Sequence, residues 1–387
     1  MTHFRLTKMD EFPRHQLGMT FDVVGSSSPH WSDGYYFTLG DNQGEMAFFV
    51  GLRLYANNDV MDAFTCISTD GKQHNMRYSR RLRPRIDDLE CGAMSLEIIE
   101  GLKTLRLQAK DNPYGITYDL LWEGFTPPYN EEHIRHFASG RLLSERSNYD
   151  QACNVSGWIQ IGDKRWEVTR EGWVGVRDHS WGVGPTGGPP TRAAAPPVIK
   201  PEPFGMRQWA LFRLPERMLF YQFHRNRHGE LTKFESQVMY PYGSDKESWA
   251  YTSIEDELEF AHGERRERRL KEGEIRLLRE DGSYERFKLE TISLPVYLEG
   301  GGYWRGFNDG LGRGVYRGED IHEGEVWDVS HPTRVIDPTG KFRFRSDHWA
   351  ETWGRLTNLD NPEETGSGHL ECVISGPYPG FVNEEDE

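Results

Sequence analysis

The sequence predicts an all-β protein of two antiparallel β-barrel or sandwich domains with few short helices, and three observations support this. Apolar and polar residues alternate with period two along segments such as 104–109 and 116–120, which is typical of half-buried strands. Turn signals such as Asp70-Gly71 and Asp281-Gly282 separate these segments. The sequence has no Gly-x-Gly-x-x-Gly that opens a helix and no regular strand–helix alternation, which argues against a doubly wound nucleotide-binding fold.

The length of 387 residues exceeds the usual size of one domain, about 100–200 residues, so we expect two domains. The first would span 1–182 and the second 204–387. Between them, 183–203 holds seven prolines and three glycines, a composition that suits neither a helix nor a central strand. This segment is either an interdomain linker or a lid loop over a pocket mouth. We expect short helices around 8–15 and 130–138.

The composition limits the class of partner. Twelve Trp, 17 Tyr and 20 Phe supply aromatic interiors, so a pair of barrels would enclose an apolar cavity suited to a hydrophobic small molecule. A net charge of -15 repels nucleic acid phosphates and anionic membrane surfaces. The start of the chain lacks the apolar core of a signal peptide, and no apolar run is long enough for a membrane span. We therefore expect a cytoplasmic protein without nucleic acid partner or stable membrane insertion, and a homo-oligomer is possible.

A short internal repeat suggests that the two halves of the sequence are related. The pair Asp178-His179 recurs at Asp347-His348, and each pair is followed by tryptophan and glycine residues. The spacing between the two pairs is close to half the chain, as a duplicated β domain would give.

The most informative segment is 171–182. On a strand, Arg177, His179 and Trp181 project from one face, while Asp178 projects from the other. Facing a pocket, His179 would give and take a proton, Arg177 would hold an anion or a phenol oxygen, and Trp181 would stack on an unsaturated ligand. Asp178 would support them from the opposite face. The alternative is a buried polar cluster that only stabilises the end of a barrel.

The motif Val176-Arg-Asp-His-Ser-Trp-Gly182 resembles the hydroxyneurosporene synthase family, the carotenoid hydratases, and the broader lipocalin-like proteins. The resemblance implies two tandem lipocalin-like β domains that add water across an isolated double bond without an organic cofactor. It places the family's catalytic His and Trp on His179 and Trp181. Where the family carries a Tyr and an Asp two residues apart, this chain has Tyr221 and Phe223, and the neighbouring His224 would replace the missing carboxylate as proton carrier.

Two further segments offer substrate-binding candidates. On a strand, Asp347, Trp349, Glu351 and Trp353 share one face, where a carboxyl held against an indole would have a raised pKa and act as a general acid. The alternative is solvated carboxylates beside tryptophans of the barrel wall. In the glycine-rich segment 300–314, Tyr303, Trp304 and Arg305 would reach a barrel mouth, because no phosphate-binding Gly-Lys-Ser/Thr follows.

These features lead to one functional hypothesis and two rivals. We expect a cofactor-independent lyase or isomerase for a hydrophobic unsaturated or aromatic molecule, of terpenoid or phenylpropanoid type, that uses His179 for acid/base catalysis. The rivals are a non-catalytic carrier and a cyclase that acts by shape alone. We expect neither a cofactor nor a metal, because the histidine pairs at 133/136 and 224/228 have no third ligand nearby in the sequence.

Overall fold

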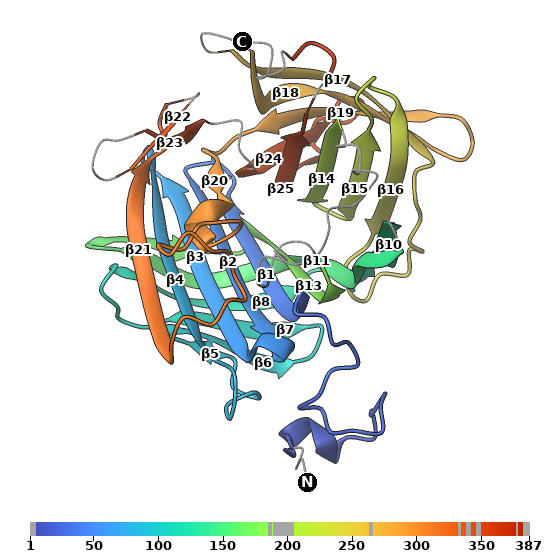
Figure 1. Cartoon of the computed structure of the whole chain (residues 1–387). Helices are drawn as coiled ribbons and strands as arrows, with labels where there is room; N and C mark the ends of the chain where they lie inside the picture. Colours follow the sequence, from blue (N-terminus) through green and yellow to red (C-terminus); the bar gives the residue numbers. More distant parts are fainter. Residues whose placement is uncertain are drawn as a thin grey trace.

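The structure is a computed structural model that describes residues 5–138, 140–184, 188, 205–262, 266–331, 334–337, 342–345, 350–376 and 378–381. Its strands form two antiparallel sheets, and each sheet is strongly curved (Figure 1). The predicted all-β class with few short helices is confirmed. Most of the predicted linker or lid segment 183–203, together with Asp347 and Trp349, lies outside the described residues.

The first sheet has the strand order β23-β22-β21-β4-β3-β2-β1-β13-β11-β8-β7-β6-β5, and β9, β10 and β12 also pair with β11. Its strands are β1 (Trp31–Asp41), β2 (Met46–Tyr55), β3 (Val60–Thr69), β4 (Lys72–Arg81), β5 (Glu90–Cys91), β6 (Met94–Glu100), β7 (Thr104–Ala109), β8 (Ile116–Gly124), β9 (Tyr129–Asn130), β10 (Ile134–Ala138), β11 (Arg141–Ile161), β12 (Lys164–Val168), β13 (Trp173–Val183), β21 (Asp320–Asp328), β22 (Arg334–Ile336) and β23 (Phe342–Arg345).

The second sheet has the order β16-β15-β14-β25-β24-β19-β18-β17, with β20 paired to β24. Its strands are β14 (Met206–Arg213), β15 (Met218–Arg225), β16 (Leu231–Met239), β17 (Ser253–His262), β18 (Arg266–Leu278), β19 (Tyr284–Thr291), β20 (Val296–Tyr297), β24 (Ala350–Asn358) and β25 (Thr365–Ile374).

The second half of the chain also contributes strands to the first sheet. After the second sheet has begun, β21 pairs along its whole length with β4, from Asp320 opposite Arg80 to Asp328 opposite Lys72. Residues from the second half of the sequence therefore complete one edge of the first sheet, and Figure 1 shows this orange strand beside the blue ones. The division into domains at 1–182 and 204–387 stays a prediction.

The described helices are three short 3₁₀ turns, Lys8–Glu11 (η1), Ala56–Asn58 (η2) and Leu298–Gly301 (η3). The helix expected at 8–15 ends at Glu11, because Phe12 before Pro13 is extended, as the proline ring requires. The prediction of a helix at 130–138 is wrong. That segment forms β9 and β10, since the long strand β11 supplies hydrogen-bond partners that outweigh local helix preference. None of the described helices is long and apolar enough to cross a membrane.

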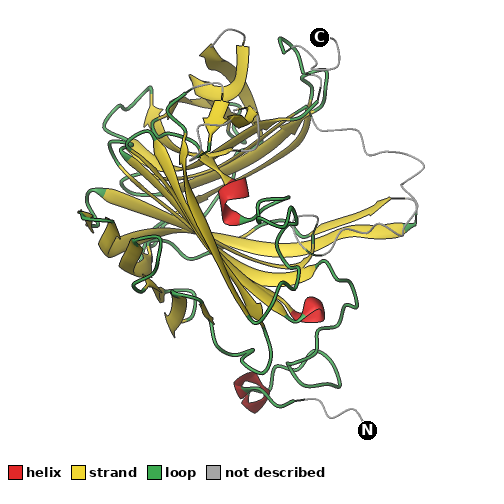
Figure 2. Ribbon diagram, turned by 60° about the vertical axis from the view of Figure 1, so that its left-hand side comes forward, coloured by secondary structure: helices red, strands yellow, loops and turns green. Residues whose placement is uncertain are grey.

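The described residues form four apolar cores, which follow from the alternation of side chains across the sheets. One fills the inside of the curved first sheet, a second fills the inside of the curved second sheet, and the third lies where the two sheets meet. The fourth is small and contains Tyr297, Trp327, Val329 and Val335. Phe37 and Leu39 of β1 point into the first core, while Phe49, Trp209 and Trp353 belong to the third. In Figure 2 the short helix η3 lies in the middle of the molecule, where the two sheets approach each other.

The contact between the sheets at Gly40 is so close that we expect Gly40→Ala to destabilise the protein. A Cβ at this position would lie 2.3 Å from Cγ of Trp353, a fully buried indole of the other sheet. Overpacking of this kind costs about 1–3 kcal/mol. Urea unfolding measures the effect, with Gly101→Ala as control because nothing lies within 4 Å of that position. Equal stability of the two variants would contradict this packing of the sheets.

Candidate functional site

The main candidate site is a cavity of about 410 Å³ at one end of the interface between the two sheets. The first sheet contributes side chains of β1, β2, β10, β11 and β13, and the second contributes side chains of β14, β15, β16, β24 and β25. The segment after η3 adds Tyr303, Trp304 and Arg313. The glycines of this segment let it lie directly on the sheet, since a Cβ at Gly301 would lie 2.6 Å from the Phe64 ring.

Strand β13 presents Val176, Asp178 and Ser180 to this cavity. Arg177 and His179 lie on the other face of the same strand, as the alternation in a strand requires. The structure therefore places the pocket on the side of Asp178, the face that the sequence analysis assigned to support. The second sheet covers this face and so creates the cavity.

The cavity contains a buried acid/base pair on adjacent strands of the second sheet. The imidazole Nε2 of His369 lies 2.6 Å from Oε2 of Glu351, and both side chains are almost fully buried. His369 packs against the rings of Trp209, at 5.0 Å between centroids, and Phe49, at 5.2 Å. No hydrogen bond joins its second ring nitrogen, Nδ1, to any described residue, so this nitrogen is free to exchange a proton with a molecule in the cavity.

A group of carboxyl groups lies on the first-sheet side. Burial and the neighbouring charge of Glu131 raise the pKa of Asp150 well above its usual range. Burial alone would raise the pKa of Glu131, but the indole N–H of Trp209, which donates to Oε1 of Glu131 at 2.8 Å, and the charge of Arg207 help to lower that pKa. Asp150 is thus the member of this pair that holds a proton, and Glu131 is the ionised one.

The pKa of Asp178, whose side chain lines the cavity, is shifted in the same direction as that of Asp150. Burial raises the pKa of Asp178, although the positive charges of Arg53 and Arg146 oppose the shift. Its Oδ1 has no hydrogen-bond partner among the described residues. A carboxyl group whose pKa is raised and which faces a cavity is a suitable general acid.

The cavity also holds cationic and neutral nitrogen groups. Arg207 forms an ion pair with Glu371 at the cavity wall. Burial, with the charges of Arg207 and Lys233, lowers the pKa of His224 to about 4, so His224 is neutral at physiological pH. Arg313 lies over the Tyr303 ring, with its guanidinium carbon 3.7 Å from the ring centroid.

His179 belongs to a separate polar cluster on the inner face of the first sheet. Its Nε2 lies 2.8 Å from Oδ1 of Asp33, and its Nδ1 lies 3.2 Å from the Tyr149 hydroxyl. Arg177 donates to Gln151, at 2.7 Å, and to the same Tyr149 hydroxyl, at 3.2 Å. Both ring nitrogens of His179 are therefore engaged with the protein. Trp181 packs edge-on against His179 and is 37% exposed.

The other predicted site residues divide between cavity, core and surface. His224, Tyr303, Trp304 and Glu351 line the cavity, whereas Tyr221, Arg305 and Trp353 do not. Tyr221 lies in the core of the second sheet and donates to Gln208, and Trp353 is buried between the sheets. Arg305 is exposed. Asp347 and Trp349 lie outside the described residues.

Sequence reasoning missed several cavity residues, among them Tyr36, Glu131, Arg146, Arg207, Arg313, His369 and Glu371. One signal points to part of this set. On β25, the polar residues Ser367, His369 and Glu371 recur with period two while the strand is otherwise rich in apolar residues. Polar side chains along one face of a strand, where that face is covered by another sheet, indicate a cavity rather than a packed apolar core.

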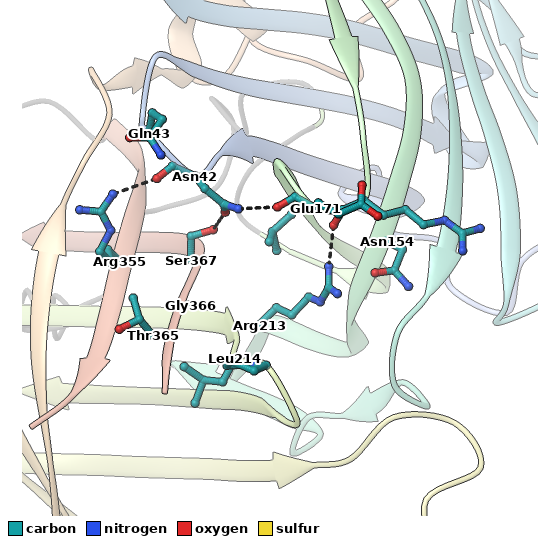
Figure 3. A pocket seen from close by; sticks show the side chains of 13 residues that line it. Asn42, Gln43, Asn154, Glu171, Arg213, Leu214, Arg355, Thr365, Gly366 and Ser367 are labelled. Atoms are coloured by element: carbon teal, nitrogen blue, oxygen red, sulfur yellow. Dashed lines mark hydrogen bonds between the residues drawn. The ribbon is translucent and has the colours of Figure 1, made fainter. Parts of the chain in front are cut away.

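A second, more open cavity of about 650 Å³ lies near the other end of β1, at the β1–β2 turn (Figure 3). There Arg355 donates to the backbone oxygen of Asn42 at 2.8 Å, and Ser367 donates to the Asn42 side chain at 2.9 Å. The Asn42 amide in turn donates to the backbone oxygen of Glu171 at 2.9 Å. These bonds connect the two sheets, so we interpret the Asn42 contacts as structural.

Residues 6–380 match the protein family described as "Family of unknown function (DUF8625)". The chain belongs to this family. A search of curated protein sequences found no match. The resemblance to the carotenoid hydratases stays confined to the motif at 176–182.

Solved structures with a similar arrangement share little sequence with the chain. The crystal structure of kievitone hydratase from Nectria haematococca has 11% identity and a TM-score of 0.42, and the alignment covers 91% of this chain and 93% of that one. The crystal structure of CghA has 12% identity and a TM-score of 0.47, with coverage of 90% and 89%. CghA with Sch210972 has 13% identity, a TM-score of 0.46 and coverage of 90% and 89%. Similarity at this level does not transfer an activity to this chain. Among the residues that the structure describes, no group of three or more His, Cys, Asp or Glu side chains is placed to hold a metal ion.

Proposed function

We propose that this protein is a cofactor-independent lyase or isomerase that acts on a hydrophobic unsaturated or aromatic small molecule in the cavity between the sheets. The observation that carries the proposal is the buried Glu351–His369 pair facing a cavity that also exposes Asp178. A base with a free nitrogen and a carboxyl group with a raised pKa are the two partners that addition or removal of water requires.

The proposed step is an elimination. His369 takes a proton from a carbon of the substrate, and Glu351 stabilises the imidazolium that forms. The electron pair of the broken C–H bond becomes the new double bond as the neighbouring C–O bond breaks. The leaving oxygen takes the proton of Asp178 and departs as water. Hydration is the reverse, and in an isomerisation His369 would return the proton to another carbon of the same molecule.

His369 is a better candidate for the acid/base than His179. Both ring nitrogens of His179 already have protein partners, Asp33 and Tyr149, whereas His369 uses one nitrogen for Glu351 and keeps the other for a ligand. His179 also faces away from the cavity. We retain as alternatives a carrier that binds the molecule unchanged and a cyclase that acts by shape, because an aromatic-lined cavity serves both. The cytoplasmic location and a homo-oligomer remain predictions.

The test is incubation of the purified protein with a panel of terpenoids and phenylpropanoids, without added cofactor. Chromatography with mass detection should show a compound that gains or loses one water or a one-carbon fragment, or a rearranged product of unchanged mass. Compounds that co-purify with the protein and are recovered unchanged would support the carrier. A cyclised product formed equally by the His369→Asn variant would support the shape-driven cyclase.

A further inference from the structure

Arg313 is a buried cation whose side chain has no hydrogen-bond or ion-pair partner among the described residues. Arg313 is 3% exposed, and its side chain lines the cavity. No hydrogen bond or ion pair links it to any described residue, and its Nε is a buried donor without an acceptor. Its neighbours are aromatic faces, with the guanidinium carbon 3.7 Å from the Tyr303 centroid and 5.6 Å from that of Phe64.

Aromatic faces stabilise a guanidinium but do not accept its in-plane N–H bonds. A buried charge with unfilled donors is costly unless an acceptor occupies the site. Asp62, whose charge acts on Arg313, does not provide one, because it accepts from the backbone N–H of Gly314 at 2.6 Å and forms no ion pair with Arg313. The N–H groups of Arg313 are therefore available to a ligand in the cavity.

Tyr36 supplies a second free donor beside it. Its hydroxyl is buried, has no partner among the described residues and lines the same cavity. Burial raises the pKa of Tyr36 well above its usual range, so the hydroxyl keeps its proton. The Tyr36 ring lies 6.2 Å from Phe64, the ring that Arg313 also approaches, and 6.1 Å from His369. The two donors thus share one wall of the cavity, next to the acid/base pair.

We propose that Arg313 and Tyr36 bind an anionic oxygen of the ligand, so that the substrate is a carboxylate or a phenol bound as phenolate. The N–H groups of arginine form charge-assisted hydrogen bonds with anionic oxygens, and these bonds are stronger than those to neutral oxygens. The inference rests on the proposed function for the position of the reacting carbon near His369. The oxygen-binding site itself requires only the cavity and its two free donors.

The test measures equilibrium binding of probes to the full chain and needs no turnover. By calorimetry, trans-cinnamate should bind at least about tenfold more tightly than its neutral analogue cinnamamide, as a charge-assisted hydrogen bond implies. Arg313→Met, which keeps the length of the side chain, should abolish this preference, and Tyr36→Phe should weaken it. The exposed Arg305→Met on the same loop is the matched control and should leave it unchanged.

A second arm separates phenolate from carboxylate. 4-Nitrophenol bound to the wild type should show the absorbance of its phenolate at a pH where the free compound is still largely neutral, and this shift should be lost in Arg313→Met. Thermal unfolding of each variant verifies folding, and the Tyr36→Phe result remains if Arg313→Met does not fold. The inference is overturned if wild type prefers neither anion, or if Arg313→Met keeps the preference. Tight anion binding without any turnover would instead count against the proposed function alone.

Discussion

Replacing His369 by asparagine is expected to lower turnover of the identified substrate by about 10²- to 10⁴-fold, the usual contribution of a positioned general base. Asparagine is close to histidine in size and still offers an amide N–H to Glu351, but it takes up no proton. Binding of the substrate should change little, because the cavity keeps its shape. Single-turnover kinetics together with equilibrium binding distinguish a lost proton transfer from a lost ligand.

His179→Asn is the matched control for this prediction. That histidine is bonded to Asp33 and Tyr149 on the other face of the sheet, so the variant should lose stability rather than the chemical step. A collapse of turnover in His179→Asn with His369→Asn unimpaired would overturn the assignment made here and favour the cluster on the inner face. Glu351→Gln should have a smaller effect than His369→Asn and should shift the pH profile, because Glu351 acts through the histidine.

Much of the fold was predictable because it depends on local pattern. The turn Asp70-Gly71 has φ values of 51° and 78°, the positive values of a tight hairpin, and the flanking strands alternate as expected. The alternation along β13 likewise separates Asp178 from His179. The sequence could not say which face would be covered, because period two describes two faces and only the long-range packing of the second sheet selects one.

The candidate site was only partly predictable for the same reason. Glu351 stood out because of its tryptophan neighbours, yet its partner His369 lies on the next strand and becomes adjacent only through the pairing of β24 with β25. Arg313 was an unremarked residue of a glycine-rich segment, and its burial depends on contacts with Phe64 and Tyr303. Such juxtapositions arise from tertiary contacts that no motif in a single sequence encodes.

Asp150→Asn is expected to make the protein more stable at neutral pH and to flatten the pH dependence of its stability. Burial and Glu131 raise the pKa of Asp150 well above 3.8 in the folded state. The folded protein therefore holds a proton that the unfolded chain has released, and the free energy of unfolding falls as pH rises between the two pKa values. The slope is about 1.4 kcal/mol per pH unit for one such group. Asparagine has nearly the same shape but no ionisable group, so it removes this cost.

Chemical unfolding across the range from acid to neutral pH tests the prediction. The variant and the wild type should be about equally stable near the unfolded pKa, and the variant should gain as pH rises. Asp119→Asn on β8 is the control with opposite sign, because a hydrogen bond from Arg106 lowers the pKa of Asp119, a shift whose stabilisation is present at neutral pH and lost in acid. That effect should be small, since the Arg106 pair is solvent-exposed. An Asp150→Asn variant that loses stability at neutral pH would mean that Asp150 is ionised there, and the assignment of a proton to Asp150 would have to be abandoned.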